Sequence, residues 1–370
     1  MAMRLVMTFR VRDEADALEE NLRFHRAQGV DRFIALEDGA AEPVGEILDR
    51  WSAAGLLERI SRPPGEAPRR RAEWITEMAR RAATHHDADW VINNDADEFW
   101  WPLRGTLRDA FASLPDRYAA LSAPRTEFVP RPGEEPWPER LIYRERLSST
   151  LPKRAHRAHP QVAATPYAVR IPGAGPPAHR GRAWLRTAAE RQEPSGAPIP
   201  ALTWPIRVLH FPVRSAEQFR TRVERAYEAG RHSAVARARE LYAALDAGTL
   251  ARRYAEATYD DGAIEAGLAS GELARDTRLR DFLRRCPGPD EPVPADALAG
   301  LGPEPGEEEE LADDGLAALL RAEQLAEGRL RTARRRLRRL ERELERLRSS
   351  DDENLRRRVA RRLRARRDTR

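Results

Sequence analysis

The stretch at residues 90–101, WVINNDADEFWW, constrains the fold more than any other part of the sequence. Its apolar half leads through two asparagines into three carboxylates, Asp95, Asp97 and Glu98. An apolar, β-branched run that ends abruptly in carboxylates is typical of a buried strand with a polar site at its carboxyl end. Ligands of open α/β sheets bind outside the carboxyl ends of the strands, so we expect Asp95 and Asp97 to face a ligand.

Asp95 and Asp97 are close enough in sequence to engage one cation, and their hard oxygen donors suit Mg²⁺ or Mn²⁺. The alternative is a solvated turn, because charged residues make up 34% of the chain and the triplet recurs at residues 87–89. Only the second copy follows the apolar run, and it is therefore the candidate site. The pattern alone leaves metal site and solvated turn both open.

The tryptophans around this stretch allow two interpretations. Core packing is the expected role of Trp74 and Trp90, since large aromatic side chains dominate protein cores. Trp100 and Trp101 follow the acidic residues, so they either line a sugar or base pocket or belong to the core.

The N-terminal third alternates strand and helix patterns, which predicts a parallel sheet. We expect strands at 3–9, 31–37, 56–60 and 90–94, with helices after Asp13, at 43–54 and at 72–84. Residues 114–205 are rich in proline, and the register of their strands is not readable; such a region commonly builds an acceptor pocket. The fold class is therefore α/β with a mostly parallel sheet.

A second strand with a polar end is predicted at residues 205–212, where it ends in His210. Ser215 and Gln218 follow with the spacing of a helix capping box. By itself, His210 is either a metal ligand or a hydrogen-bonded structural histidine.

The rest of the chain is predicted to form three parts: a small helical extension at 246–285, a Pro/Gly/Glu linker at 286–310 and an Arg-rich amphipathic helix or short coiled coil at 311–370. Residues 329–370 hold 19 Arg against 7 acidic residues, a local charge of +12, so the net +5 of the chain leaves −7 for the remainder. Leucines spaced by three and four predict either self-association or contact with anionic lipid. The tail lacks the interleaved aromatics of nucleic-acid binders, so no specific nucleic acid is expected.

Cysteine usage and hydropathy predict the compartment. Cys286 is the single cysteine, which excludes an intrachain disulfide and a cysteine-based zinc site. Without a signal-like N-terminus or a long apolar span, the expected location is cytoplasmic, with peripheral contact at the inner face of the membrane as an option.

Four segments in this order resemble bacterial family 2 glycosyltransferases: residues 7–14, 22–31, 88–100 and 210–219. The resemblance covers roughly residues 3–225. It implies the GT-A fold, an αβα sandwich within a domain at 1–245, together with a nucleotide-sugar donor and Mn²⁺ or Mg²⁺.

The resemblance also implies roles for individual residues. Asp95 and Asp97 match the Asp-x-Asp motif that bridges metal and diphosphate, and His210 matches a late histidine that completes the metal shell. The residues expected near the nucleotide are Arg10, Arg12 and Glu14 of the first loop, Glu37 near base and ribose, and Arg214 near the leaving phosphate. Residues 37–43 lack the usual serines, so UDP-sugar and GDP-sugar both remain open as donors.

The expected activity is metal-dependent transfer of one sugar to a glycan or lipid-linked acceptor, with inversion. Inversion needs a carboxylate base. Glu127, Glu134 and Glu135 all lie in the right region and the sequence does not separate them; Glu127 is taken as the candidate. The chain lacks the Gln-x-x-Arg-Trp motif of processive synthases, which argues against polymer extrusion.

Two alternatives come from other classes of protein. One is a non-catalytic scaffold, with a degenerate sugar-nucleotide domain and a self-associating basic tail. The other is a phosphotransferase with an Asp nucleophile, which normally has its acidic pair after the first strand and a later lysine; this chain has one lysine, Lys153.

Removal of residues 311–370 tests the two predicted roles of the tail. If the leucine seam associates, the full chain sediments as an oligomer and the truncated chain as a monomer. If the tail instead binds lipid, both forms sediment alike and only the full chain binds anionic liposomes, more weakly as salt rises.

Overall fold

The computed structural model describes residues 3–39, 42–62, 71–114, 119–146, 153–165, 169–172, 206–228, 236–286, 291–294 and 296–301. The predicted coiled-coil tail at 311–370 lies outside the described residues. Within the described part of the chain, no helix is both long and apolar enough to cross a bilayer.

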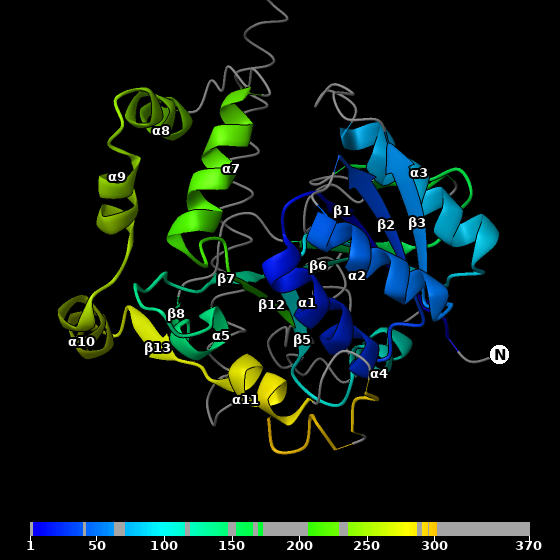
Figure 1. Cartoon of the computed structure of the whole chain (residues 1–370). Coiled ribbons are helices and arrows are strands. Elements are labelled where there is room, and N and C mark those ends of the chain that lie inside the picture. Colours follow the sequence, from blue (N-terminus) through cyan, green and yellow to red (C-terminus); the bar gives the residue numbers. More distant parts are fainter. Residues whose placement is uncertain are drawn as a thin grey trace, which may run out of the picture. The chain divides into compact units, whose positions relative to one another are not determined.

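Four parallel strands form the first part of the main sheet, in the order β3-β2-β1-β4. Figure 1 labels the first three of them. The elements of this part are β1 (Leu5–Val11), α1 (Ala15–Ala27), β2 (Arg32–Asp38), α2 (Glu42–Ala53), β3 (Leu57–Arg62), α3 (Arg71–His85) and β4 (Trp90–Asn94). Each predicted strand and helix of the N-terminal third is confirmed to within a few residues.

Two antiparallel strands complete the main sheet. β9 (Lys153–Arg157) pairs with β4, and β6 (Ala120–Ala123) pairs with β9. Both come from the proline-rich region at 114–205, where the register of the strands could not be predicted from the sequence. The sheet is therefore largely parallel, with an antiparallel edge contributed by a distant segment.

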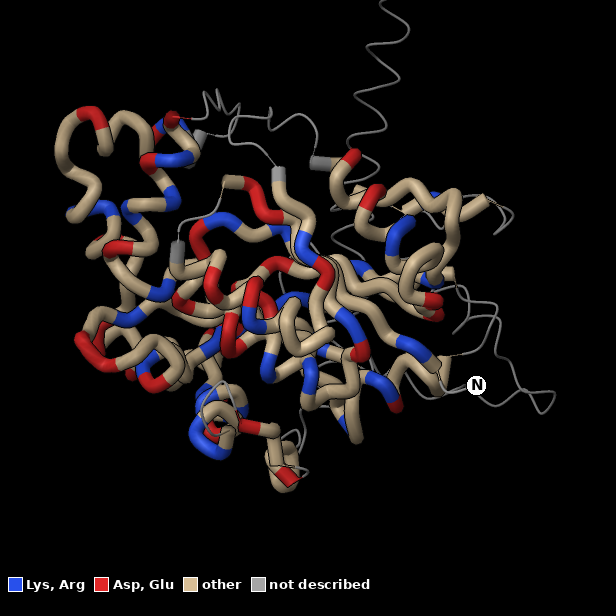
Figure 2. Tube along the Cα trace, turned by 45° about the vertical axis from the view of Figure 1, so that its right-hand side comes forward, with Lys and Arg blue, Asp and Glu red and all other residues tan. Residues whose placement is uncertain are grey.

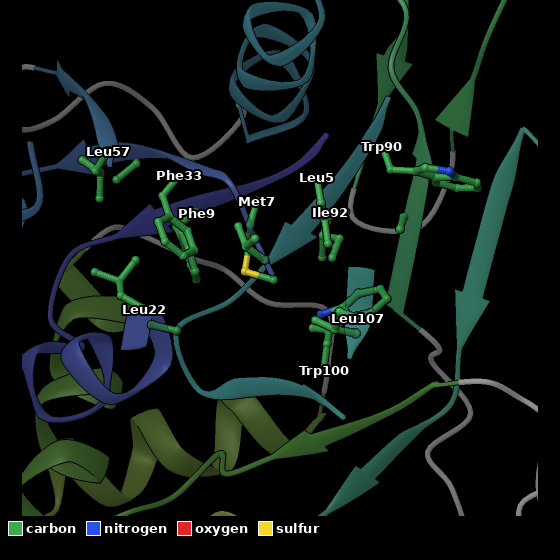
Figure 3. Close-up of a cluster of buried hydrophobic side chains, with 14 of the residues drawn as sticks. Leu5, Met7, Phe9, Leu22, Phe33, Leu57, Trp90, Ile92, Trp100 and Leu107 are labelled. Carbon is green, nitrogen blue, oxygen red and sulfur yellow. The ribbon is translucent and has the colours of Figure 1, made fainter. Parts of the chain in front are cut away.

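Helices cover both faces of this sheet. Successive side chains of β1 point to opposite faces, and both faces carry apolar, buried side chains. Met7 and Phe9 pack with Leu22 of α1 and Leu48 of α2, whereas Val6 packs with α3. Figure 3 shows the first of these two clusters. The result is a three-layer α/β arrangement.

A second, three-stranded sheet follows the acidic turn directly, in the order β5-β12-β7. β12 (Ile206–His210) runs antiparallel to β5 (Glu98–Pro102) and parallel to β7 (Arg125–Glu127). The predicted strand ending in His210 is confirmed. β5 was not foreseen, because its aromatic residues were also compatible with a pocket wall.

Trp100 and Trp101 are core residues, so their predicted alternative as pocket walls is wrong. Trp100 is fully buried, and its Nε1–H donates to Asn94 Oδ1 at 2.9 Å. Trp101 stacks on Phe24, with ring centroids 5.2 Å apart. Trp74 and Trp90 are also buried, as expected.

The smaller elements lie around these sheets. They are α4 (Leu107–Ala112), α5 (Trp137–Arg140), β8 (Tyr143–Glu145), β10 (Ala163–Ala164), β11 (Val169–Arg170), α7 (Ala216–Glu228), α8 (Ala236–Asp246), α9 (Leu250–Ala257), α10 (Asp261–Ser270), β13 (Leu273–Arg275) and α11 (Arg278–Arg285). Ser215 Oγ accepts from the Gln218 N–H at 3.0 Å, which is half of the predicted capping box. The Gln218 side chain accepts instead from the Arg214 N–H at 3.2 Å.

The predicted extension at 246–285 is largely helical, but it also contributes strand β13, which pairs with β8. Phe282 of α11 meets Phe24 of α1 edge-on at 5.1 Å. The stretch expected to act as a linker without core content buries Ala297 and Leu301 in the same cluster. The division of the chain at residues 245, 285 and 310 stays a prediction.

A buried polar network holds the turn between β4 and β5. The amide nitrogen of Asn21, on α1, donates to the carbonyls of Ala96 and Glu98 at 3.0 and 2.8 Å. The amide nitrogen of Asn94 donates to the Glu98 carbonyl at 3.0 Å and lies 3.2 Å from Asn21 Oδ1. These bonds satisfy buried backbone groups that neither sheet reaches, so they fix the shape of the acidic turn.

His25 belongs to the same network as a neutral imidazole. Its Nε2 accepts the backbone N–H of Trp100 at 3.1 Å, so its Nδ1 carries the proton and faces Asn21 Oδ1 at 2.8 Å. Burial lowers the pKa of His25 to about 3, although the hydrogen bond to Asn21 opposes this shift.

This depressed pKa predicts acid sensitivity. Below about pH 6.5, His25 is protonated in the unfolded chain but stays neutral in the native state. The contribution of His25 to the free energy of unfolding therefore falls by up to about 1.4 kcal/mol for each pH unit. The loss continues until the pH nears the folded pKa of about 3. Urea unfolding of the wild type and His25→Gln at several pH values should give the variant a shallower slope between about pH 6.5 and 4.5. Equal slopes would contradict the assignment.

Candidate active site

The candidate site lies at the carboxyl ends of β1 and β4. The turn at residues 95–97 joins β4 to β5 and is closed by the Glu98 N–H, which donates to the Asp95 carbonyl at 3.0 Å. β2 and β3 are added to the sheet on one side of β1, whereas β4 is added on the other side. The strand order therefore reverses between β1 and β4. A crevice forms where the strand order of an open α/β sheet diverges in this way.

Strand pairing in the second sheet aligns three titratable side chains. Glu98 of β5 is the register partner of His210 of β12, and His210 is the partner of Glu127 of β7. Direct cross-strand partners project from the same face of a sheet. A row of carboxylate, imidazole and carboxylate therefore stands beside the acidic turn.

His210 is a charged imidazolium between two carboxylates. Its Nδ1 bonds to Glu127 Oε2, and its Nε2 lies 3.5 Å from Asp97 Oδ2. Burial alone would lower the pKa of His210, but the charge and hydrogen bond of Asp97 and those of Glu127 outweigh it and raise the pKa to about 9. The side chain that the sequence placed at a strand end is thus held in a fixed orientation.

Asp97 is a strongly acidic group of the site. Burial would raise its pKa, but the charge of His210, the hydrogen bond to it and the charge of Arg214 together hold the pKa well below its ordinary value. Arg214 is fully buried and binds Asp16 through Nε and Nη2, both at 2.7 Å, while its Nη1 lies 3.8 Å from Asp97 Oδ2. Most of its hydrogen-bonding capacity is directed at protein atoms, so Arg214 orders the site.

Lys153, at the start of β9, joins the acidic turn to the carboxylate row. Its Nζ lies 2.8 Å from Asp95 Oδ2 and 2.5 Å from Glu98 Oε2. Sequence reasoning missed this residue, because it weighed Lys153 only against the spacing of phosphotransferases. The signal was present, since this is the single lysine of the chain.

The end of β1 and the loop after it supply two arginines, Arg10 and Arg12, that converge on a buried carboxylate. Arg10 Nη2 and Arg12 Nη2 lie 2.9 and 2.7 Å from Asp38 Oδ2. Glu14 folds back and accepts the backbone N–H groups of Arg12 and Asp13, both at 2.9 Å. Burial raises the pKa of Glu14, with a further contribution from the charge of Asp97.

Glu37 is the predicted residue that the structure places elsewhere. Its Oε2 bonds to Arg59 Nε at 2.7 Å and to Ser61 Oγ at 3.1 Å, both on β3. The side chains of consecutive strand residues point to opposite faces of the sheet, so the side chain of Asp38, the next residue, contacts Arg10 and Arg12 instead. Asp38, and not Glu37, is therefore the acidic residue that contacts these two arginines, and the contact of Glu37 with a nucleotide stays a prediction.

These groups line a pocket of about 660 Å³. Seven carboxylates, seven arginine or lysine side chains and His210 face it; the charged residues are Arg10, Arg12, Asp13, Glu14, Asp16, Asp95, Asp97, Glu98, Arg125, Lys153, Arg214, Glu217, Arg222 and Arg225. Figure 2 shows acidic and basic positions interspersed along the trace rather than separated into two faces. Such a surface offers partners both to a cation and to the negative groups of a polar ligand.

Three side chains on this pocket suit a divalent metal. Ligand atoms of Asp97, Glu98 and His210 lie within 4.8 Å of one another, the single such group found among the described residues. Carboxylate and neutral imidazole donors are compatible with Mn²⁺ or Mg²⁺, so His210 would lose its Nε2 proton when a metal binds. The predicted set was Asp95, Asp97 and His210. The structure groups Glu98 with the last two, while Asp95 faces Lys153.

Comparisons with known proteins show weak structural likeness. No family model and no curated protein matches the sequence. The 1–349 form of S. aureus TarS in complex with UDP-GlcNAc is similar over 42% of this chain and 46% of that one, at 13% identity and a TM-score of 0.31. A longer S. aureus TarS structure gives 11% identity, 42% and 28% coverage, and a TM-score of 0.27. The structure of 4-diphosphocytidyl-2C-methyl-D-erythritol synthase is similar over 36% of this chain and 65% of that one, at 14% identity and a TM-score of 0.24.

The chain spans less than half the length of these TarS structures. Likeness at this level assigns no function. The resemblance to family 2 glycosyltransferases therefore stays a prediction from the sequence motifs.

Replacing Glu127 with Gln should lower the pKa of His210. The substitution keeps the shape of the side chain but removes one of the two negative charges that hold the imidazolium, so we expect a fall of at least about one unit from the value near 9. Histidine ring signals followed by NMR against pH in metal-free protein measure it. Glu134→Gln is the matched control, since Glu134 is not among the groups that shift the pKa of His210. An unchanged His210 pKa in Glu127→Gln would contradict the arrangement.

Proposed function

We propose that this protein is a glycosyltransferase that moves one sugar from a nucleoside-diphosphate sugar to a hydroxyl of a glycan or lipid-linked acceptor, with a divalent metal at Asp97, Glu98 and His210. The observation that carries the proposal is the position of this group. It lies on one wall of a pocket at the strand divergence, and Arg10 and Arg12 line the same pocket.

The proposed chemistry follows from the charges around the pocket. Breaking the bond between sugar and diphosphate leaves negative charge on a phosphate oxygen, and a bound divalent metal stabilises that charge. Arg10, at the end of β1, and Arg12, on the loop after it, lie where a nucleotide in this crevice would bind. Arg214 keeps Asp97 ionised and in place through its charge and its bonds to Asp16.

Glu127 is better explained as a positioning residue than as the predicted base. Its carboxylate is bound by His210 and by Arg125 Nε at 2.9 Å, and it does not line the pocket. Burial would raise its pKa, but the bond and charge of His210 and those of Arg125 lower it. A general base works best with a pKa near the operating pH, so a carboxylate held this acidic is a weak one. The proposed inversion then needs another base.

One observation favours a second candidate, a phosphotransferase with Asp95 as nucleophile. Lys153 Nζ, 2.8 Å from Asp95 Oδ2, supplies the later lysine that this chemistry requires. The acidic pair, however, follows β4 and not the first strand. Incubation with beryllofluoride and Mg²⁺ separates the two, because only a nucleophilic Asp95 forms a stable phosphate-like adduct. The glycosyltransferase proposal expects no adduct.

Nucleotide binding tests the proposed function directly and separates it from a non-catalytic scaffold. UDP and GDP, each with Mn²⁺ and with EDTA, are added in a thermal-shift assay. Ligand at about 100 times its Kd stabilises the folded state by about 2.7 kcal/mol, which is readily detected. We expect one of the two nucleotides to shift the Tm more with Mn²⁺ than without.

Asp97→Asn should remove the metal-dependent part of the shift and abolish hydrolysis and transfer of the donor. Asp87→Asn is the matched control. It alters the duplicate Asp-x-Asp triplet at a side chain that is 88% exposed. Retention of metal-dependent binding by Asp97→Asn, or its loss in Asp87→Asn, would contradict the proposal.

A further inference from the structure

Lys153 is exceptional in the composition of this chain and in its place in the fold. The sequence has 65 lysines and arginines, and all but this one are arginine. Lys153 lies on β9, the strand next to β4, and its side chain is 8% exposed, yet it lines the pocket. Where a positive charge alone suffices, this chain uses arginine, so the ammonium itself matters here.

The ammonium is fixed by two carboxylates that it shares with the acidic turn. Asp95 Oδ2 lies 2.8 Å away and Glu98 Oε2 lies 2.5 Å away. Burial alone would lower the pKa of Lys153, but the charges of Asp95 and Glu98 and the hydrogen bonds to them raise it. Lys153 is therefore charged throughout the ordinary pH range.

An ammonium has three N–H donors around a compact charge, whereas a guanidinium is a planar fork. Two of the three donors of Lys153 are directed to Asp95 and Glu98. Within the described residues, Lys153 contacts these two carboxylates and also lines the pocket, so its ammonium lies where a ligand can reach it.

Glu98 connects this lysine to the proposed metal group. Its Oε2 contacts Lys153, and the same residue supplies a ligand atom to the group with Asp97 and His210. A metal at that group and the ammonium of Lys153 would be neighbouring cations. Two adjacent cations match the charge of a diphosphate, whose two phosphates each present negative oxygens.

We propose that Lys153 is a ligand-contacting residue whose ammonium binds the diphosphate of the donor beside the metal position, while Asp95 holds this ammonium and not the metal. The inference rests on the proposed function and assigns different tasks to the two carboxylates of the Asp-x-Asp motif. Asp97 belongs to the metal group, and Asp95 orients a cation that the protein itself provides.

The test measures two binding reactions separately in the full chain. UDP and GDP binding is followed by isothermal titration calorimetry in EDTA, where Lys153 acts without metal. Mn²⁺ binding is followed by electron paramagnetic resonance without nucleotide. The variants are Lys153→Met, Lys153→Arg, Asp95→Asn and Asp97→Asn, and urea unfolding confirms that each is folded.

Lys153→Met should bind the nucleotide in EDTA about tenfold to a hundredfold more weakly than the wild type, the loss that corresponds to one charge-assisted hydrogen bond. Its Mn²⁺ affinity should stay equal or rise, because a neighbouring positive charge is removed. Lys153→Arg keeps the charge but displaces it, so it should restore binding only in part; it also serves if Lys153→Met does not fold. Asp95→Asn should retain Mn²⁺ binding, and Asp97→Asn should lose it.

Unchanged nucleotide binding in EDTA by Lys153→Met would overturn this inference and leave the proposed function intact. Loss of Mn²⁺ binding in Asp95→Asn would also overturn it, since Asp95 would then be a metal ligand. If the wild type binds neither nucleotide with or without Mn²⁺, the proposed function fails, and the inference fails with it.

Discussion

The buried hydrogen bonds of Asn21 and Asn94 hold the end of the main sheet against the start of the second one. Both amides reach the carbonyl of Glu98, and Asn21 also reaches that of Ala96. A buried polar network fully bonded in this way favours a single geometry, because each alternative leaves a buried group unsatisfied. The carboxylates of the turn are positioned by amides that never meet a ligand.

From this fixed turn the chain builds a site of nearly balanced charge. Arg214 and Asp16, Lys153 and Asp95, and His210 with Glu127 are pairs drawn from segments distant in sequence. Removing one member of a buried pair leaves an uncompensated charge, so such pairs bind the segments to one another. The same arrangement keeps Asp97 ionised and His210 protonated, and a charged ligand enters a site already oriented for it.

Strands and helices with strong local patterns could be predicted from the sequence. Which of two adjacent residues points to a given face of a sheet could not. Glu37 and Asp38 are adjacent acidic residues, and only the pairing of β2 between β1 and β3 decides which of them meets Arg10 and Arg12. Trp100 and Trp101 carried the same ambiguity, since an aromatic pair after a turn can line a pocket or begin a buried strand. Long-range pairing with β12 resolved it in favour of the strand.

Local sequence patterns were enough to predict the order of parallel strands and helices in the N-terminal third, the acidic turn at the end of β4 and the strand that ends in His210. These features depend on hydrophobic period and local turn chemistry, which a short window contains. The tertiary structure alone decided that Glu98 joins Asp97 and His210 and that Lys153 meets Asp95, because strands 50 or more residues apart must pair before these side chains converge. The sequence of residues 90–101 thus indicates a site, whereas the register of the sheets decides which distant side chains join it.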